Sequence, residues 1–238
     1  MNNRKFDEEY FNKNEFFKPY LWGFGRSPYE LNKYKRQIDL IKALLSPNDP
    51  KEAKNILEIG CAEGIFTEML LKEFPNSKVT GIEFSKNALK RAEKRLEPYG
   101  ERVELIHGDI VEKAKELPSK IFDAAFMSEM INYIGNDFPI PALNDRVIYP
   151  VAESLKLGSP LIIAQIVGMI DYPEESSTRI PVIHSYKTML AEQPILKKAY
   201  DESFLEYKDE ENQVFKYEIW GFRRVDEKKE PNWRWRKA

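Results

Sequence analysis

The hydrophobic pattern of this chain changes repeatedly between two periods. Short apolar runs with many β-branched residues have the length and composition of buried strands. They lie at residues 56–59, 79–83, 103–107, 122–127 and 161–167. Most of the segments between them place apolar residues three or four positions apart, which predicts amphipathic helices. These segments lie at residues 29–45, 65–72, 86–96, 139–157 and 186–191.

Strands that alternate with helices predict a mostly parallel sheet with helices on both faces. Two further runs, 204–208 and 214–222, are joined by the polar stretch Asp209-Glu-Glu-Asn-Gln and predict an antiparallel hairpin at the end of the sheet. The expected fold is therefore α/β and doubly wound, with a mostly parallel seven-stranded sheet that ends in a C-terminal antiparallel hairpin.

The pattern is less regular at both ends and after the fifth predicted strand. Residues 1–28 form an aromatic-rich arm, which either packs on the main domain or covers a substrate site. We expect the main domain to comprise residues 29–226, with a loop-rich insert at 169–185 on the substrate side. Together the arm and the insert are predicted to form a mobile lid. Residues 227–238 form a charged tail.

Composition narrows the class of protein. The chain has 238 residues, enough for one sizeable core, and a net charge of −2, which gives no overall basic field for nucleic acid. The single cysteine, Cys61, excludes an internal disulfide framework. The apolar runs are too short to span a membrane, and the N-terminus lacks the apolar core of a signal peptide. We therefore expect a cytoplasmic enzyme without nucleic-acid or membrane binding; a homodimer stays open.

The stretch Asn55-Ile-Leu-Glu-Ile-Gly-Cys-Ala-Glu-Gly64 joins the first predicted strand to a helix. Glycines at such a turn allow a tight bend and a close approach of a ligand to the backbone. The spacing Glu-x-Gly-x-Ala-x-Gly differs from the Gly-x-Gly-x-x-Gly of hydride-transfer enzymes. The stretch thus indicates a ligand site of another kind.

Polar residues follow four of the predicted strands at the edge of the sheet where ligands bind in open α/β folds. Glu83 ends the second strand, where a carboxylate can accept hydrogen bonds from both hydroxyls of a ribose. Phe84 could place its ring against adenine, and Asp109 could accept a hydrogen bond from an exocyclic amino group. Each carboxylate could instead be solvated in a loop, but two of them at successive strand ends favour a binding role. Glu58 and the pair Ser128-Glu129 lie at the other two strand ends.

Residues 53–134 resemble the cofactor-binding half of class I S-adenosylmethionine-dependent methyltransferases. The matching motifs are Leu57-Glu-Ile-Gly-Cys-Ala-Glu-Gly64, Gly81-Ile-Glu-Phe-Ser85, His107-Gly-Asp-Ile110 and the segment 122–134. Ala62 stands in place of the middle glycine of the family's first motif. The helix 29–45 and the run Ser128-Glu-Met-Ile-Asn-Tyr133 are similar to nodulation-type N-methyltransferases, which methylate an amino sugar.

This resemblance implies a Rossmann-like fold and S-adenosyl-L-methionine as the cofactor. The methionine end of the cofactor would lie over the turn 60–64, near backbone groups and a helix N-terminus that can bind its carboxylate. Tyr34 and Arg36 of the leading helix would assist. The residues expected to contact the cofactor are Tyr34, Arg36, Glu58, Gly60, Cys61, Ala62, Gly64, Glu83, Phe84, Asp109, Ile110 and Ser128.

The acceptor is expected to be a small-molecule amine, possibly of an amino sugar. An ammonium must lose a proton before its nitrogen can attack, and Glu129 at the fourth strand end could bind and deprotonate it. Tyr133 and His184 are the other candidate catalytic residues; Glu129 could alternatively cap the next helix. No metal is expected, because two histidines without cysteine or carboxylate partners do not form a metal site. O-methylation, protein or RNA methylation, and an inactive cofactor-binding partner subunit are the alternatives.

Overall fold

The computed structural model describes residues 7–12, 28–45, 55–171, 177–179, 181–208 and 213–226. Most of the arm 1–28, parts of the insert 169–185 and the tail 227–238 lie outside these residues.

The described residues contain eight strands in one sheet. The strands are β1 (Asn55–Ile59), β2 (Lys78–Glu83), β3 (Val103–His107), β4 (Ala124–Ser128), β5 (Pro160–Asp171), β6 (Ser177–Arg179), β7 (Leu196–Lys208) and β8 (Gln213–Arg224). The helices are α1 (Glu8–Asn12), α3 (Pro28–Leu44), α4 (Ile65–Glu73), α5 (Lys86–Leu96), α6 (Ile110–Lys113), α7 (Ile131–Asp137), α8 (Ile140–Leu143), α9 (Tyr149–Ser154) and α10 (Pro181–Ala191). Three short helical turns are η1 (Glu97–Arg102), η2 (Ala114–Glu116) and η3 (Asn144–Ile148).

The strand order is β3-β2-β1-β4-β5-β8-β7, with β6 paired to β5. Strands β1 to β5 are mutually parallel, whereas β8 is antiparallel to both β5 and β7. The chain runs outward from β1 to β3 and then crosses back to β4, so the order reverses between β1 and β4. This confirms the predicted Rossmann-like, doubly wound sheet of seven strands with a C-terminal antiparallel pair; β6 is an addition that the sequence pattern did not indicate.

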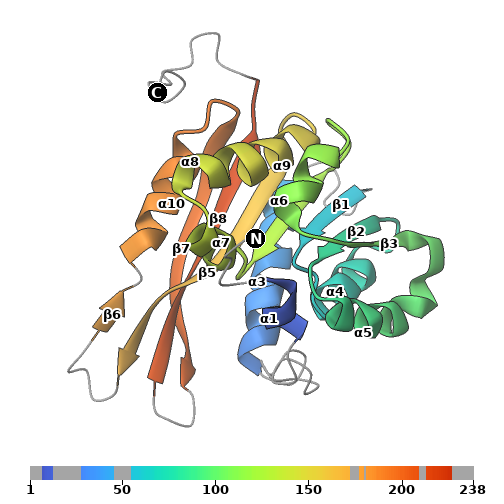
Figure 1. Ribbon diagram of the computed structural model, residues 1–238, viewed down its shortest axis with the longest axis horizontal. Helices are drawn as coiled ribbons and strands as arrows, with labels where there is room; N and C mark the ends of the chain where they lie inside the picture. The colour runs from blue at the N-terminus through green and yellow to red at the C-terminus, as the bar shows by residue number, and fades with distance from the viewer. Residues whose placement is uncertain are drawn as a thin grey trace.

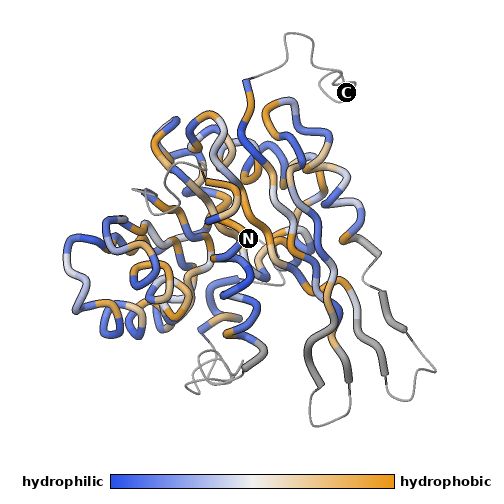
Figure 2. Tube along the Cα trace, turned by 180° about the vertical axis from the view of Figure 1, so that it is seen from behind, coloured by the Kyte–Doolittle hydropathy of each residue, from blue (hydrophilic) through white to orange (hydrophobic). Residues whose placement is uncertain are grey.

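Helices cover both faces of the sheet (Figure 1) because successive strand residues point to opposite faces. On β1, Leu57 and Ile59 join the core beneath α6 to α10, whereas Ile56 joins the core beneath α3 to α5. On β4, Met127 and Phe126 divide in the same way. The most hydrophobic parts of the trace accordingly lie in the central strands (Figure 2). Burial on both faces explains why these strands are predominantly apolar.

Five elements differ from the sequence prediction: β5, β7, β8, α7 and α10. Strand β5 continues to Asp171, where a loop was expected from residue 169, because its pairing with β8 resumes beyond a bulge between Ile166 and Gly168. Strands β7 and β8 are also longer than the predicted hairpin. Their pairing is made by main-chain hydrogen bonds, which do not require a continuous apolar pattern. Helix α10 begins at Pro181, five residues before the predicted start, and α7 was not predicted.

Candidate cofactor and acceptor site

A cavity of about 220 Å3 opens at the carboxyl ends of the parallel strands, where the strand order reverses. This is the position at which open α/β sheets bind ligands. It is lined by residues that follow β1, β2, β3 and β4, together with residues of α1, α3, α7, β5 and β8. The predicted site residues that line it are Gly60, Ala62, Glu83, Phe84, Asp109, Ile110, Ser128, Glu129 and Tyr133. The structure therefore brings together residues as far apart in sequence as Gly60 and Tyr133.

The turn after β1 takes its shape from three residues in the left-handed region, Gly60, Ala62 and Gly64. Gly60 has φ 77° and Ala62 has φ 46°, so Ala62 adopts a conformation that favours glycine. A Cβ on Gly60 would lie 2.3 Å from Sδ of Met130, which packs over it. The backbone N–H of Gly60 donates to the carbonyl of Ile82 at 2.8 Å and ties the turn to β2.

Two residues of this turn have packing roles. Gly64 lines neither this cavity nor the smaller one beside it; it has φ 75°, and a Cβ there would lie 2.8 Å from Cδ1 of Leu96 on α5. The prediction that Gly64 contacts the cofactor is therefore not supported by its position. Cys61 is buried against Gly81 of β2, where an added Cβ would lie 2.9 Å from its Sγ.

Glu83 connects the end of β2 to the turn after β1. Its buried carboxylate accepts hydrogen bonds from the backbone N–H of Ala62 at 2.9 Å and of Ser85 at 2.7 Å. Burial raises the pKa of Glu83, while the backbone donors oppose that rise. Because a carboxylate offers about four acceptor positions, Glu83 can hold the turn and still accept from hydroxyls in the cavity.

The far end of the cavity is formed by Phe84, Asp109 and Ile110. Asp109 caps α6, its carboxylate accepting from the N–H of Val111 at 3.0 Å. His107 lies behind Phe84, with its Nε2 3.1 Å from the Phe84 carbonyl. The geometry is compatible with the predicted adenine site, since an aromatic ring and a carboxylate border one apolar pocket.

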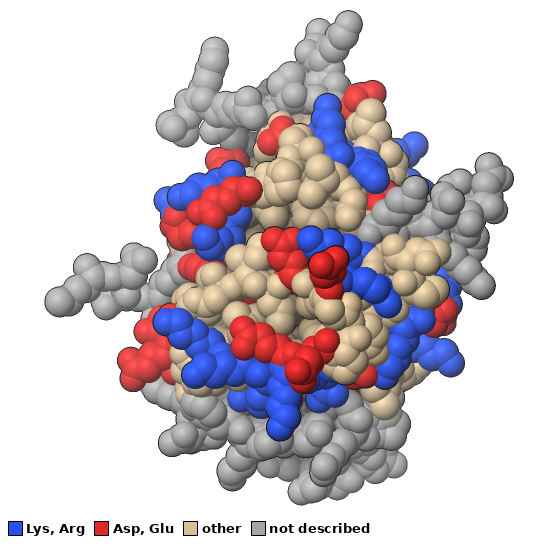
Figure 3. Space-filling model, turned by 90° about the vertical axis from the view of Figure 1, so that its right-hand side faces the viewer, with Lys and Arg blue, Asp and Glu red and all other residues tan. Residues whose placement is uncertain are grey.

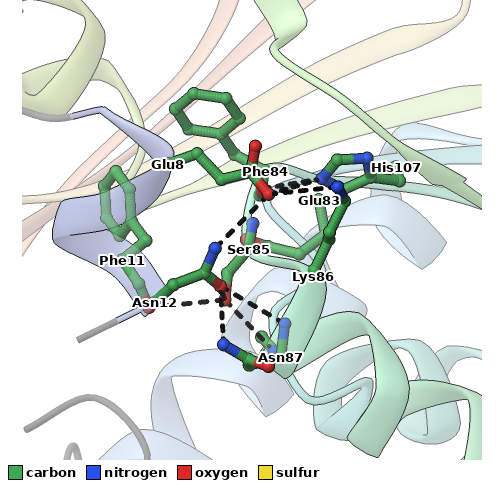
Figure 4. Close-up of polar contacts among 10 residues, drawn as sticks. Glu8, Phe11, Asn12, Glu83, Phe84, Ser85, Lys86, Asn87 and His107 are labelled. Carbon is green, nitrogen blue, oxygen red and sulfur yellow. Dashed lines mark hydrogen bonds and ion pairs between the residues drawn. The ribbon is translucent and has the colours of Figure 1, made fainter. Parts of the chain in front are cut away.

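Helix α1, the described part of the arm, lies directly over this end (Figure 4). Its Phe11 lines the cavity and meets the rings of Phe84 and Tyr133 edge-on, at 6.2 and 5.3 Å between centroids. The neighbouring Asn12 accepts hydrogen bonds through Oδ1 from Ser85 Oγ at 2.8 Å and Asn87 Nδ2 at 3.0 Å. Glu8 Oε1 lies 3.2 Å from His107 Nε2 and adds a second attachment.

A smaller cavity adjoins the first at the turn. Its lining includes Lys33, Tyr34, Glu58, Cys61 and Glu129. Glu58 is buried, and burial raises its pKa to about 7, although a 2.6 Å hydrogen bond from Thr67 Oγ1 opposes the rise. Tyr34 stacks on Phe66 with 4.8 Å between ring centroids, so it both packs in the core and borders this cavity.

Glu129 lies between the two cavities in a strained conformation. Its φ of 58° is uncommon for a residue with a side chain and costs on the order of 1 kcal/mol. Its Oε2 accepts from Gln165 Nε2 at 2.9 Å and from the N–H of Ile166 at 3.1 Å, and its Oε1 lies 3.4 Å from Lys33 Nζ. These contacts fix the carboxylate toward β5, and it does not cap α7, which begins without a side-chain cap. Burial raises its pKa, and Lys33 opposes the rise.

Tyr133 and Ser128 complete the wall beside Glu129. Burial and the nearby Glu129 raise the pKa of Tyr133 to about 12, so its hydroxyl stays protonated at neutral pH. Ser128 Oγ accepts a 3.3 Å hydrogen bond from Gln37 on α3.

Two predicted site residues lie elsewhere. Arg36 pairs with Glu202 of β7 at 2.8 Å and stacks over Phe204, because its position on α3 faces the antiparallel strands. His184 is exposed on α10 and does not line either cavity. The structure therefore does not support their assignment as a cofactor ligand and a catalytic residue.

Several residues that line the site were not predicted. Glu30 and Tyr217 border the larger cavity, Lys33 borders the smaller one, and Glu63, paired with Arg91 at 2.7 Å, borders both. A usable signal existed for α3, where Glu30, Lys33 and Gln37 share the buried face with Tyr34. Polar residues at three- and four-residue spacing on an apolar face indicate a buried polar site.

Comparison with known proteins agrees with this geometry. Residues 56–145 match the family model described as "Methyltransferase domain". Over this segment the chain is similar to methyltransferase domains. S-adenosylmethionine is its cofactor, and a buried carboxylate beside a glycine turn at the strand-order reversal fits that molecule.

Relatives and solved structures extend the comparison. The chain is 35% identical over 88 residues to malonyl-[acyl-carrier protein] O-methyltransferase 2 of Ilyobacter polytropus, covering 37% of this chain and 32% of that protein. It is 26% identical over 129 residues to the carboxy-S-adenosyl-L-methionine synthase of Nautilia profundicola, covering 54% of this chain and 49% of that protein. The chain thus spans between a third and a half of the length of these curated relatives.

The solved structures show a shared fold. Magnesium protoporphyrin IX methyltransferase from Synechocystis PCC 6803, with bound S-adenosylmethionine, superposes with a TM-score of 0.61 at 15% identity. The match covers 94% of this chain and all of that one. It extends the class I fold well beyond the segment 56–145.

Neither a membrane-spanning helix nor a metal-binding cluster occurs among the described residues. No helix there is long and apolar enough to cross a membrane. No group of three or more His, Cys, Asp or Glu side chains in the same residues is arranged to hold a metal ion.

Proposed function

We propose that this protein transfers a methyl group from S-adenosylmethionine to the nitrogen of a small amine. The observation that carries the proposal is Glu129, a carboxylate fixed at the end of β4 by Gln165, Ile166 and Lys33, and facing the cavity. An amine that reaches this point meets a group that can bind its charged form and remove its proton.

The charges of the cavity favour a cationic acceptor. Glu30, Glu129 and Asp137 are among its lining residues, whereas the one cation among the described lining residues, Arg91, is paired with Glu63. These carboxylates would attract an ammonium and repel a carboxylate acceptor. The face drawn in Figure 3 carries acidic and basic side chains interspersed, which also supports a small acceptor rather than a nucleic acid.

When bound, S-adenosylmethionine supplies an electrophilic methyl group, whose bond to sulfur breaks as the bond to nitrogen forms, with the electron pair of the broken bond remaining on sulfur. Glu129 binds the ammonium, takes one proton from it and so exposes the nitrogen lone pair. The side chains of Tyr133 and Phe11 form an apolar wall that limits access of water. Holding the reactants in line is the chief contribution expected from the protein, with a ceiling of roughly 7–11 kcal/mol.

Replacing Glu83 by alanine is expected to weaken binding of S-adenosylhomocysteine by about 1–3 kcal/mol, the range for losing hydrogen bonds at a buried polar group. Isothermal titration measures the effect. Glu93→Ala, which removes an exposed carboxylate on the neighbouring α5, is the control and should bind normally. An unchanged dissociation constant for Glu83→Ala would refute the ribose assignment.

The arm and the insert are proposed to close over the bound molecules. S-adenosylhomocysteine should slow amide hydrogen exchange in residues 1–28, because α1 rests on Phe84 and Ser85 at the predicted adenine site. Residues 169–185 should show the same change, and the buried strand β4 serves as the internal reference. If neither segment changed, the aromatic arm would have a packing role only.

A further inference from the structure

Lys33 of α3 is a buried cation shared by two carboxylates. Its side chain is 1% exposed, and its Nζ lies 2.9 Å from Glu30 Oε2 and 3.4 Å from Glu129 Oε1. The rings of Tyr34 and Tyr217 lie 5.3 and 5.5 Å from the same nitrogen. A lysine that has lost its hydration is stable only with such partners, so its position is closely determined.

Lys33 also faces the place where the amino-acid end of the cofactor should lie. It lines the smaller cavity with Gly60 and Ala62 of the turn, and it is the cationic side chain among the described residues of that lining. Glu58 and Glu63 are acidic residues of the same lining. A ligand carboxylate entering between them requires a compensating positive charge, which Lys33 can supply.

Glu129 lines both cavities, and Lys33 lines the smaller one. Lys33 therefore lies between the expected position of the cofactor and Glu129, the carboxylate that would bind the methyl acceptor. We propose that Lys33 is a positioning residue that moves from Glu129 toward the cofactor's carboxylate, and thereby frees Glu129 to bind the acceptor's ammonium. This inference rests on the proposed function. Its consequence is an order of binding, in which the acceptor's cation site becomes complete only after the cofactor has bound.

The contact distances fit this exchange. The contact between Lys33 and Glu129 is the longer of its two ion pairs, whereas Glu30 lies one helical turn away on the same helix and can remain paired throughout. Glu129 keeps its hydrogen bonds from Gln165 and Ile166 when Lys33 moves, so its carboxylate stays in place. The exchange thus changes the charge balance at Glu129 without moving the base.

The test compares two ligands that differ by one carboxylate: S-adenosylhomocysteine and its decarboxylated analogue, which keeps the amino group. Isothermal titration of the full chain with both ligands is expected to show that two variants change the affinity for S-adenosylhomocysteine in opposite directions. Lys33→Gln should weaken S-adenosylhomocysteine about 10- to 100-fold, the range for a hydrogen bond to a charged group. Glu129→Gln should tighten it about three- to tenfold, because a competing negative charge has gone. The analogue should bind both variants as it binds wild type.

If Lys33 had only a structural role, Lys33→Gln would weaken the binding of both ligands equally, and that result would overturn the proposal. If Glu129→Gln weakened the binding of S-adenosylhomocysteine but not of the analogue, that result would overturn the proposal as well, whether or not the Lys33→Gln protein folds. Lys33→Arg, which keeps the charge, should restore most of the preference for the carboxylate-bearing ligand. Failure of wild type to bind either ligand would instead refute the proposed function.

Discussion

A Gly60→Val protein is expected to fold and yet lose measurable affinity for S-adenosylhomocysteine. Gly60 has φ 77°, and the new Cβ would lie 2.3 Å from Sδ of Met130. The strain of a left-handed valine costs about 1–3 kcal/mol, and the displaced Met130 must enter the cavity that it lines. Affinity should therefore fall by two orders of magnitude or more, as measured by isothermal titration.

Gly158 provides a matched control for this substitution. It has φ 81°, close to that of Gly60, but an added Cβ there would meet no atom within 4 Å. Gly158→Val should thus lower the melting temperature through backbone strain alone and leave ligand affinity unchanged. Normal binding by Gly60→Val would contradict the role assigned to the turn after β1.

Glu129→Gln is expected to reduce turnover by roughly 10²–10⁴-fold, the contribution typical of a general base. The amide keeps the size of the side chain but cannot accept the proton of the ammonium. Its binding of S-adenosylhomocysteine should not weaken, so the loss should appear in kcat. Glu93→Gln is the control, because it removes an exposed carboxylate on α5 that lines neither cavity, and its turnover should be unchanged.

The pH profile gives a second readout of Glu129. Burial raises the pKa of Glu129, so its carboxylate accepts a proton at a higher pH than an exposed glutamate would. The base is active only when ionised; turnover should therefore fall as the pH drops through this raised pKa. Glu129→Gln should lose that acid limb, and wild-type-like turnover in this variant would remove Glu129 from the mechanism.

The cofactor half of the molecule could be predicted from the sequence because its determinants are local. The run 56–59, the glycine turn and Glu83 lie on adjacent strands, and parallel pairing brings their ends together without further information. Ala62 shows the limit of this reasoning: the residue type suggests a departure from the family motif, whereas its φ of 46° shows that the backbone keeps a conformation favoured by glycine.

The acceptor half could not be predicted in the same way because it depends on contacts between distant elements. Gln165 interrupts an apolar strand, a visible signal, but only the pairing of β4 with β5 shows that it holds Glu129. Arg36 and Lys33 lie three positions apart on α3, and helical periodicity alone does not decide which one faces the cavity. The tertiary packing of α3 against β5 assigned that role to Lys33.

The most direct test of the central claim is a methyl-transfer assay with labelled S-adenosylmethionine and matched acceptor pairs, each an amine and its hydroxyl analogue. Mass spectrometry of the products locates the added methyl group. The account predicts transfer to the nitrogen of amines, no transfer to the hydroxyl partners, and a loss of roughly 10²–10⁴-fold in Glu129→Gln. Transfer to the hydroxyl partners, or to amines at the same rate in Glu129→Gln, would contradict it.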